Sequence, residues 1–185
     1  DQAIHQLDVC NWALNRRPIQ AVGQGGRRGR PEFGDSWSNY QVLYQYPGNI
    51  NVSLHSTQIG STFGDVCARF IGTKGIAEAH YSRGVFIEGD NPWDSGVVKG
   101  QPTEEHRRSG AFTSALHDSD ANKTKAFIES IESGNLINEA HSGATSTLSA
   151  ILGRMSATAK EAKTWHEMYY SGQKYNPQLN LEQFR

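Results

Sequence analysis

Residues 40–55, YQVLYQYPGNINVSLH, decide the fold of this 185-residue chain. From Tyr40 to Tyr46, tyrosine and valine alternate with glutamine and leucine, and the alternation resumes from Ile50 to His55. Pro47-Gly48-Asn49 separates the two runs. Alternation with a period of two on both sides of a Pro-Gly-Asn turn is typical of a β-hairpin.

Further short strands are expected on both sides of this hairpin. The stretch from Pro18 to about Gly26 has an extended pattern, and residues 66–71, 76–81 and 85–88 follow the hairpin, separated by short glycine-containing turns. Connections this short leave no room for crossover helices, so the sheet is predicted to be mostly antiparallel.

Helices are expected at the two ends of the strand run, over residues 1–15, 118–133 and 139–162. The order of helix, strands and helices predicts an α+β fold, a mostly antiparallel sheet with helices packed on one face and the other face available for oligomerisation. Residues 1–185 are predicted to form a single domain. The residues expected to be buried on the three helices are Ala3, Ile4, Leu7, Cys10, Asn11 and Leu14; Ala126, Phe127, Ile128 and Ile131; and Ala144, Leu148, Ile151, Leu152 and Met155.

Composition excludes several classes of function. The formal net charge of −1 lacks the basic excess of a nucleic-acid-binding protein. No apolar run approaches the roughly 20 residues that a membrane-spanning helix needs. Cys10 and Cys67 are the two cysteines and form no Cys-x-x-Cys pair, so neither a disulfide scaffold nor a metal site is expected.

The first helix carries the candidate chemistry. At about 100° per residue, Asp1, His5, Asp8 and Trp12 fall within an arc of roughly 60°. Carboxylates one turn from an imidazole orient it and raise its pKa, which suits a general base or acid. The alternative interpretation is a solvated helix face stabilised by side-chain pairs.

A series of motifs in order resembles one family. DQAIHQLDVCNWAL at 1–14 and RPIQAVGQGGR at 17–27 resemble the opening of the C-terminal domain of the glucose–fructose oxidoreductase / inositol dehydrogenase (Gfo/Idh/MocA) family. YPGNINVS at 46–53, FIGTKG at 70–75, FIESIESG at 127–134 and ILGRMS at 151–156 agree with it. The similarity covers most of the chain.

This resemblance implies a function and a site. Family members join an N-terminal Rossmann domain that binds NAD or NADP to an α+β domain that supplies much of the substrate site. They oxidise or reduce a small-molecule carbohydrate, a sugar or polyol, by hydride transfer. His5 and Asp1 match the catalytic residues: His5 accepts the hydroxyl proton and Asp1 orients the substrate. Asp8 matches a supporting position, and the open sheet face is expected to form a homo-oligomer.

The cofactor domain is the departure from the family pattern. The glycine cluster GQGGRRG at 23–29 has Arg28 where a dinucleotide-binding turn needs its third glycine, and no helical pattern follows it. The cofactor is therefore expected to be bound mainly by a domain absent from this chain, and the chain alone is expected to be inactive.

Several alternatives remain open at this stage. An NAD-dependent glycosidase of the same family and a catalytically silent binding or assembly module fit the same motifs. Arg27, Arg28 and Arg30 fit a nucleic-acid- or phosphate-binding loop, although a solvated loop or oligomer contact is the preferred interpretation. The compartment is open, with the cytoplasm as the default and export as the alternative.

Overall fold

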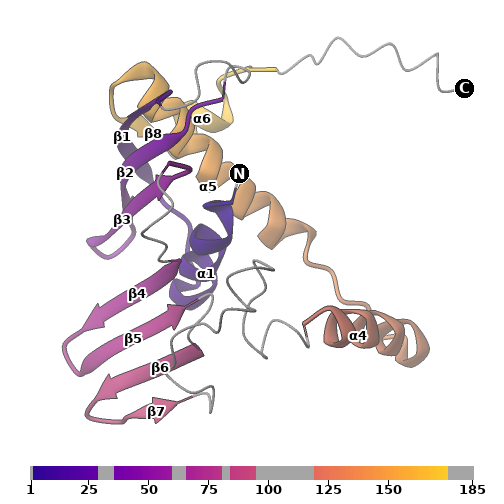
Figure 1. Cartoon of the computed structure of the whole chain (residues 1–185). Helices are drawn as coiled ribbons and strands as arrows, with labels where there is room; N and C mark the ends of the chain where they lie inside the picture. Colours follow the sequence, from indigo (N-terminus) through magenta and orange to yellow (C-terminus); the bar gives the residue numbers. More distant parts are fainter. Residues whose placement is uncertain (1, 29–35, 60–65, 81–83, 95–118, 175–185) are drawn as a thin grey trace, which may run out of the picture. The chain divides into compact units, whose positions relative to one another are not determined.

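The computed structural model describes residues 2–28, 36–59, 66–80, 84–94 and 119–174 (Figure 1). The chain divides into two compact units, which are described separately. One contains residues 1–15 and 60–147, and the other contains residues 16–59 and 148–185.

The unit of residues 16–59 and 148–185 is built on a four-stranded antiparallel sheet. Its strand order is β3-β2-β1-β8. The predicted hairpin is confirmed: Tyr46 pairs with Ile50, and the turn is closed by Gly48 and Asn49 at positive φ, a conformation that both residue types tolerate. The strands are β1 (Gln20–Gly26), β2 (Asn39–Tyr46), β3 (Ile50–Thr57) and β8 (Lys163–Thr164).

Helices cover one face of this sheet, as predicted. Helix α5 (Ala140–Ala159) approaches so closely that a Cβ on Gly153 would lie 2.0 Å from the Tyr44 hydroxyl oxygen. Helix α6 (Trp165–Tyr169) follows β8, and the Arg17 guanidinium lies 4.4 Å from the centre of the Trp165 ring. On the opposite face, Val22 and Leu43 are each 44% exposed.

Helix α5 differs from its prediction in two ways. It ends at Ala159 rather than at residue 162, because Lys160 takes the left-handed conformation and the chain turns into β8. Its buried face also carries smaller side chains than expected. Ser149, Leu152 and Ser156 are fully buried, whereas Ala144 is exposed. Small side chains face inward because the helix backbone lies directly against Tyr44.

The other unit contains a second antiparallel sheet, with the order β4-β5-β6-β7. The predicted antiparallel α+β class is thus confirmed, although the strands form two sheets where the sequence suggested one. Helix α1 contacts β4. The elements of this unit are α1 (Ile4–Leu14), β4 (Cys67–Gly72), β5 (Gly75–His80), β6 (Gly84–Gly89), β7 (Trp93–Asp94), α4 (Ser119–Ser133) and the start of α5.

Helix α4 has the predicted length but not the predicted burial. Phe127, Ile128 and Ile131 are exposed, and Ser130 is the buried side chain. An apolar stripe shows which face of a helix is suited to packing against a partner. It does not show that a partner covers that face. Within the described ranges, no helix is both long and apolar enough to cross a membrane.

Candidate functional site

Helix α1 has a buried face and an exposed polar face. Leu7, Cys10 and Asn11 are buried, as the sequence predicted. His5 and Trp12 are exposed on the other side, Trp12 by 81%. The helix therefore presents an imidazole and an indole on one polar face, while its apolar side anchors it.

A buried serine holds the polar face in place. The Ser146 hydroxyl, at the start of α5, donates a hydrogen bond of 2.5 Å to Asp8 Oδ1 and accepts one of 3.3 Å from Asn11 Nδ2. Ser146 is 3% exposed. Asp8, one turn from His5, is thereby fixed by another helix of the same unit, which suits a supporting role rather than chemistry of its own.

Helix α1 begins later than the sequence predicted. The helix begins at Ile4, and Ala3 provides no side-chain cap. Gln2 and Ala3 form a turn. Asp1 lies outside the described residues, so the structure places His5 and Asp8 but not the predicted pair of Asp1 and His5.

The described glycines of the cluster lie in a strand and not in a dinucleotide-binding turn. Gly23, Gly25 and Gly26 lie within β1 and pair in register with Val42, Tyr40 and Asn39 of β2. A dinucleotide-binding turn instead connects a strand to a helix. Arg27 and Arg28 follow this strand, and the backbone of Arg28 is bonded to the Ser38 hydroxyl. Arg30 lies outside the described residues.

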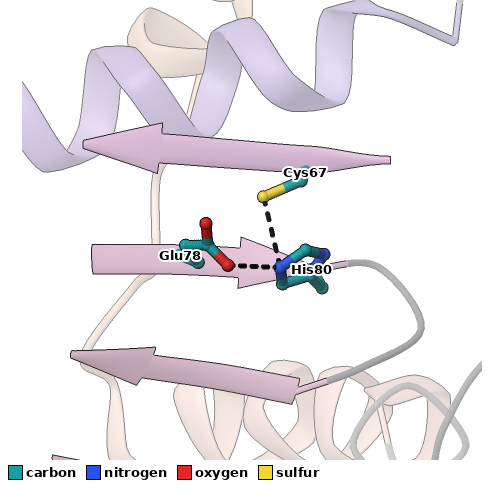
Figure 2. A group of neighbouring side chains, drawn as sticks. All are labelled: Cys67, Glu78 and His80. Atoms are coloured by element: carbon teal, nitrogen blue, oxygen red, sulfur yellow. Dashed lines mark hydrogen bonds and ion pairs between the residues drawn. The ribbon is translucent and has the colours of Figure 1, made fainter. Parts of the chain in front are cut away.

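A second cluster, Cys67, Glu78 and His80, was not foreseen. His80 Nε2 lies 3.6 Å from Cys67 Sγ and 2.8 Å from Glu78 Oε2 (Figure 2). The other carboxylate oxygen, Glu78 Oε1, is paired with Arg69 Nε. These contacts lower the pKa of Glu78, first through the hydrogen bond to His80 and then through the one to Arg69.

A sequence signal for this cluster existed. The Gly72-Thr73-Lys74-Gly75 turn sets the hairpin register, and counting outward from it places Cys67 opposite His80. Glu78 and His80 are two residues apart and share a face of β5. Spacing along the chain, without this strand pairing, does not bring the three residues together.

Comparison with solved structures identifies the fold. The scyllo-inositol dehydrogenase of Lactobacillus casei, with bound NAD(H) and scyllo-inositol, is 17% identical; the match covers 88% of this chain and 46% of that chain, with a TM-score of 0.64. The myo-inositol 2-dehydrogenase of Lactobacillus plantarum is 16% identical; the match covers 87% of this chain and 46% of that chain, with a TM-score of 0.63.

The aldose–aldose oxidoreductase of Caulobacter crescentus, complexed with glycerol, matches at 13% identity with a TM-score of 0.61, over 88% of this chain and 45% of that one. The chain has the fold of part of a Gfo/Idh/MocA-type oxidoreductase. The resemblance drawn from the sequence motifs is confirmed at the level of fold.

The extent of the match is limited in two respects. The chain spans about half the length of the Gfo/Idh/MocA-type structures that it matches. No protein-family model matches it, and no curated protein matches it significantly in sequence.

Proposed function

We propose that this chain is the substrate-binding part of an NAD(P)-dependent oxidoreductase that acts on a sugar, a polyol or a related carbohydrate. The observation that carries the proposal is the exposed His5 on α1, with Asp8 one turn away and held by Ser146. The fold shared with NAD(H)- and inositol-bound enzymes supports it.

His5 is assigned the role of general base toward a substrate hydroxyl. An exposed imidazole on a helix that is anchored along its other side can meet a bound hydroxyl without rearrangement of the core. Asp1 is assigned to orient the same substrate, and Asp8 to position the helix face. Trp12, on the exposed face of α1, offers an apolar surface for the C–H bonds of a carbohydrate ring.

The described glycines of the cluster at 23–29 do not fit the cofactor itself. The described glycines of the cluster are engaged in the β1–β2 ladder, so no step of the reaction is assigned to a dinucleotide held here. We place NAD(P) binding in a further domain of the intact enzyme, where the nicotinamide would supply the hydride chemistry. Residues 1–185 alone are then expected to bind substrate without turnover.

The open face of β1, β2 and β3 is proposed as a contact between copies of the chain. Val22 and Leu43 lie opposite each other at its centre, both partly exposed, among glutamine side chains. Replacing Leu43 with glutamate should lower the molar mass measured by light scattering if this face forms the oligomer. An unchanged mass would remove this part of the proposal.

The catalytic assignment is tested with the full-length enzyme. Nicotinamide absorbance is followed against a panel of sugars and polyols for the wild type, His5→Asn and His141→Gln. His141 is an exposed histidine of α5 and serves as the matched control. We expect His5→Asn to lower kcat by about 100-fold or more, as loss of a general base does, with His141→Gln unchanged. Equal activities of the His5 variant and the wild type would contradict the assignment.

A further inference from the structure

Three side chains on neighbouring strands converge on one point, away from the polar face of α1. Cys67 on β4 pairs with His80 on β5, and Glu78 lies two residues before His80 on the same strand face. Their donor atoms all lie within 4.8 Å of one another (Figure 2). The cluster therefore combines a thiol, a carboxylate and an imidazole in one place, and the hairpin register fixes it there.

The hydrogen bonds within the cluster meet at one atom. Both Cys67 Sγ and Glu78 Oε2 approach the same ring nitrogen, His80 Nε2. That nitrogen carries at most one hydrogen, so one proton cannot satisfy both neighbours fully. A nucleophilic relay would use the two ring nitrogens separately, one toward the thiol and one toward the carboxylate. The donor atoms of the three side chains are nonetheless grouped closely enough to surround a cation.

The distance between Cys67 Sγ and His80 Nε2 fits a tetrahedral zinc ion. With zinc–ligand bonds of about 2.0–2.3 Å, ligand atoms in a tetrahedral site are roughly 3.4–3.6 Å apart. The 3.6 Å between Cys67 Sγ and His80 Nε2 already has this value, and the 2.8 Å between His80 Nε2 and Glu78 Oε2 must widen by about half an ångström.

The surroundings hold the ligands in position. The His80 side chain is 7% exposed, and its ring stacks on Phe86 at 5.7 Å with an interplanar angle of 19°. The Glu78 side chain is 17% exposed, and Arg69 occupies its other oxygen, as an outer partner does for a ligating carboxylate. A thiolate and a carboxylate together would offer two negative charges to a divalent ion, one of them shared with Arg69.

We propose that Cys67, Glu78 and His80 bind a divalent transition-metal ion, with zinc as the favoured occupant. Thiolate and imidazole donors select zinc over calcium and magnesium, which take oxygen ligands. The ion fastens β4 to β5 in the unit that contains α1, and water or another group completes its coordination. This assignment is independent of the proposed oxidoreductase activity and replaces the expectation of no metal site.

The test uses the full chain, which is freed of bound metal ions with a chelator and then titrated with Co²⁺. We expect a near-ultraviolet thiolate-to-cobalt absorption band and visible bands of tetrahedral cobalt, both abolished by added Zn²⁺. Cys67→Ser and His80→Gln should weaken binding by more than about 100-fold, since even outer partners of metal ligands are worth 10–100-fold. Cys10→Ala, which removes the other cysteine, and His141→Gln should bind as the wild type does.

A second measurement covers variants that fail to fold. In the wild type, Zn²⁺ should protect Cys67 from alkylation, as located by peptide mapping, and should raise the melting temperature. The proposal is overturned by a folded wild type that gives no thiolate–cobalt band. It is equally overturned by a band that survives Cys67→Ser or disappears in Cys10→Ala, or by alkylation of Cys67 that Zn²⁺ does not slow.

Discussion

The Ser146 hydroxyl donates a hydrogen bond of 2.5 Å to the Asp8 carboxylate, across 138 positions of sequence. The same oxygen accepts from the buried Asn11 amide, so one side chain of α5 holds two successive turns of α1. Ser146 and Asn11 are both buried, so loss of their hydrogen bonds would leave polar groups without a partner and destabilise the protein.

Ser146→Ala is therefore expected to destabilise the protein by about 1–3 kcal/mol, because the buried Asn11 amide and the Asp8 carboxylate both lose a partner. Urea unfolding measures the change. Ser142→Ala is the matched control on the same helix, since Ser142 is exposed and its hydroxyl donates to the nearby Glu139 carbonyl oxygen. It should alter stability by no more than about 0.5 kcal/mol. Equal effects of the two substitutions would show that the link to α1 contributes little.

Local pattern was sufficient for most of the strands and helices. Alternation and the Pro47-Gly48-Asn49 turn predicted the β2–β3 hairpin within two residues of its observed ends. The apolar rhythm of α1 predicted that Leu7, Cys10 and Asn11 face inward. These features depend on residues close in sequence, so a single sequence contains the information.

Features that depend on distant partners were not predictable in this way. The two-residue β8 has no pattern of its own and exists because Lys163 and Thr164 pair with β1. The inward serines of α5 follow from its close approach to Tyr44, and the apolar residues of α4 are exposed despite their helical spacing. The grouping of Cys67 with Glu78 and His80 required strand register as well as composition.

Gly153→Ala tests the close approach of α5 to β2. An added Cβ would lie 2.0 Å from the hydroxyl oxygen and 2.8 Å from Cζ of Tyr44, a fully buried side chain. Overpacking of this kind costs about 1–3 kcal/mol. The expected result is a lower urea midpoint, partly restored in the double variant with Tyr44→Phe, which removes the nearest atom.

Gly143→Ala on the same helix provides the comparison. No atom lies within 4 Å of the Cβ that it would add. Alanine favours the helix over glycine by up to about 1 kcal/mol, so this substitution should stabilise the protein. If both glycine substitutions were stabilising, the packing of α5 against Tyr44 would be looser than the structure indicates.

The capping box of α6 predicts a pH dependence. The Thr164 backbone N–H, and then its hydroxyl, donate to the Glu167 carboxylate and lower the pKa of Glu167. A lowered folded-state pKa contributes stability above the unfolded value of about 4.3, and that contribution is lost as the pH falls through the folded value. The wild type should therefore exceed Glu167→Gln in urea midpoint near pH 7, and the difference should shrink as the pH falls below about 4.3 and through the lowered pKa of Glu167. In a Thr164→Ala background, the effect of Glu167→Gln on the urea midpoint should be smaller at neutral pH. If the difference in midpoint persists at low pH, the Glu167 carboxylate is not its cause.

The two cysteines should differ in reactivity. Burial raises the pKa of the Cys10 thiol to about 11. At pH 8 only about one Cys10 thiol in a thousand is ionised, against roughly one in four for an ordinary cysteine, and the thiolate is the reactive form. In a Cys67→Ala variant, the remaining thiol should react with a disulfide reagent slowly in the native state and rapidly in urea.

The reverse variant, Cys10→Ala, reports Cys67 under the same conditions. Cys67 is only partly buried, so in the presence of a chelator it should react faster in the native state than Cys10 does. Because the reagent and the pH are the same, the ratio of the two native-state rates isolates burial and ionisation. Rapid native labelling of Cys10 would mean that α1 separates from its packing surface on the timescale of the reaction, and the anchored polar face proposed for His5 would then have to be abandoned.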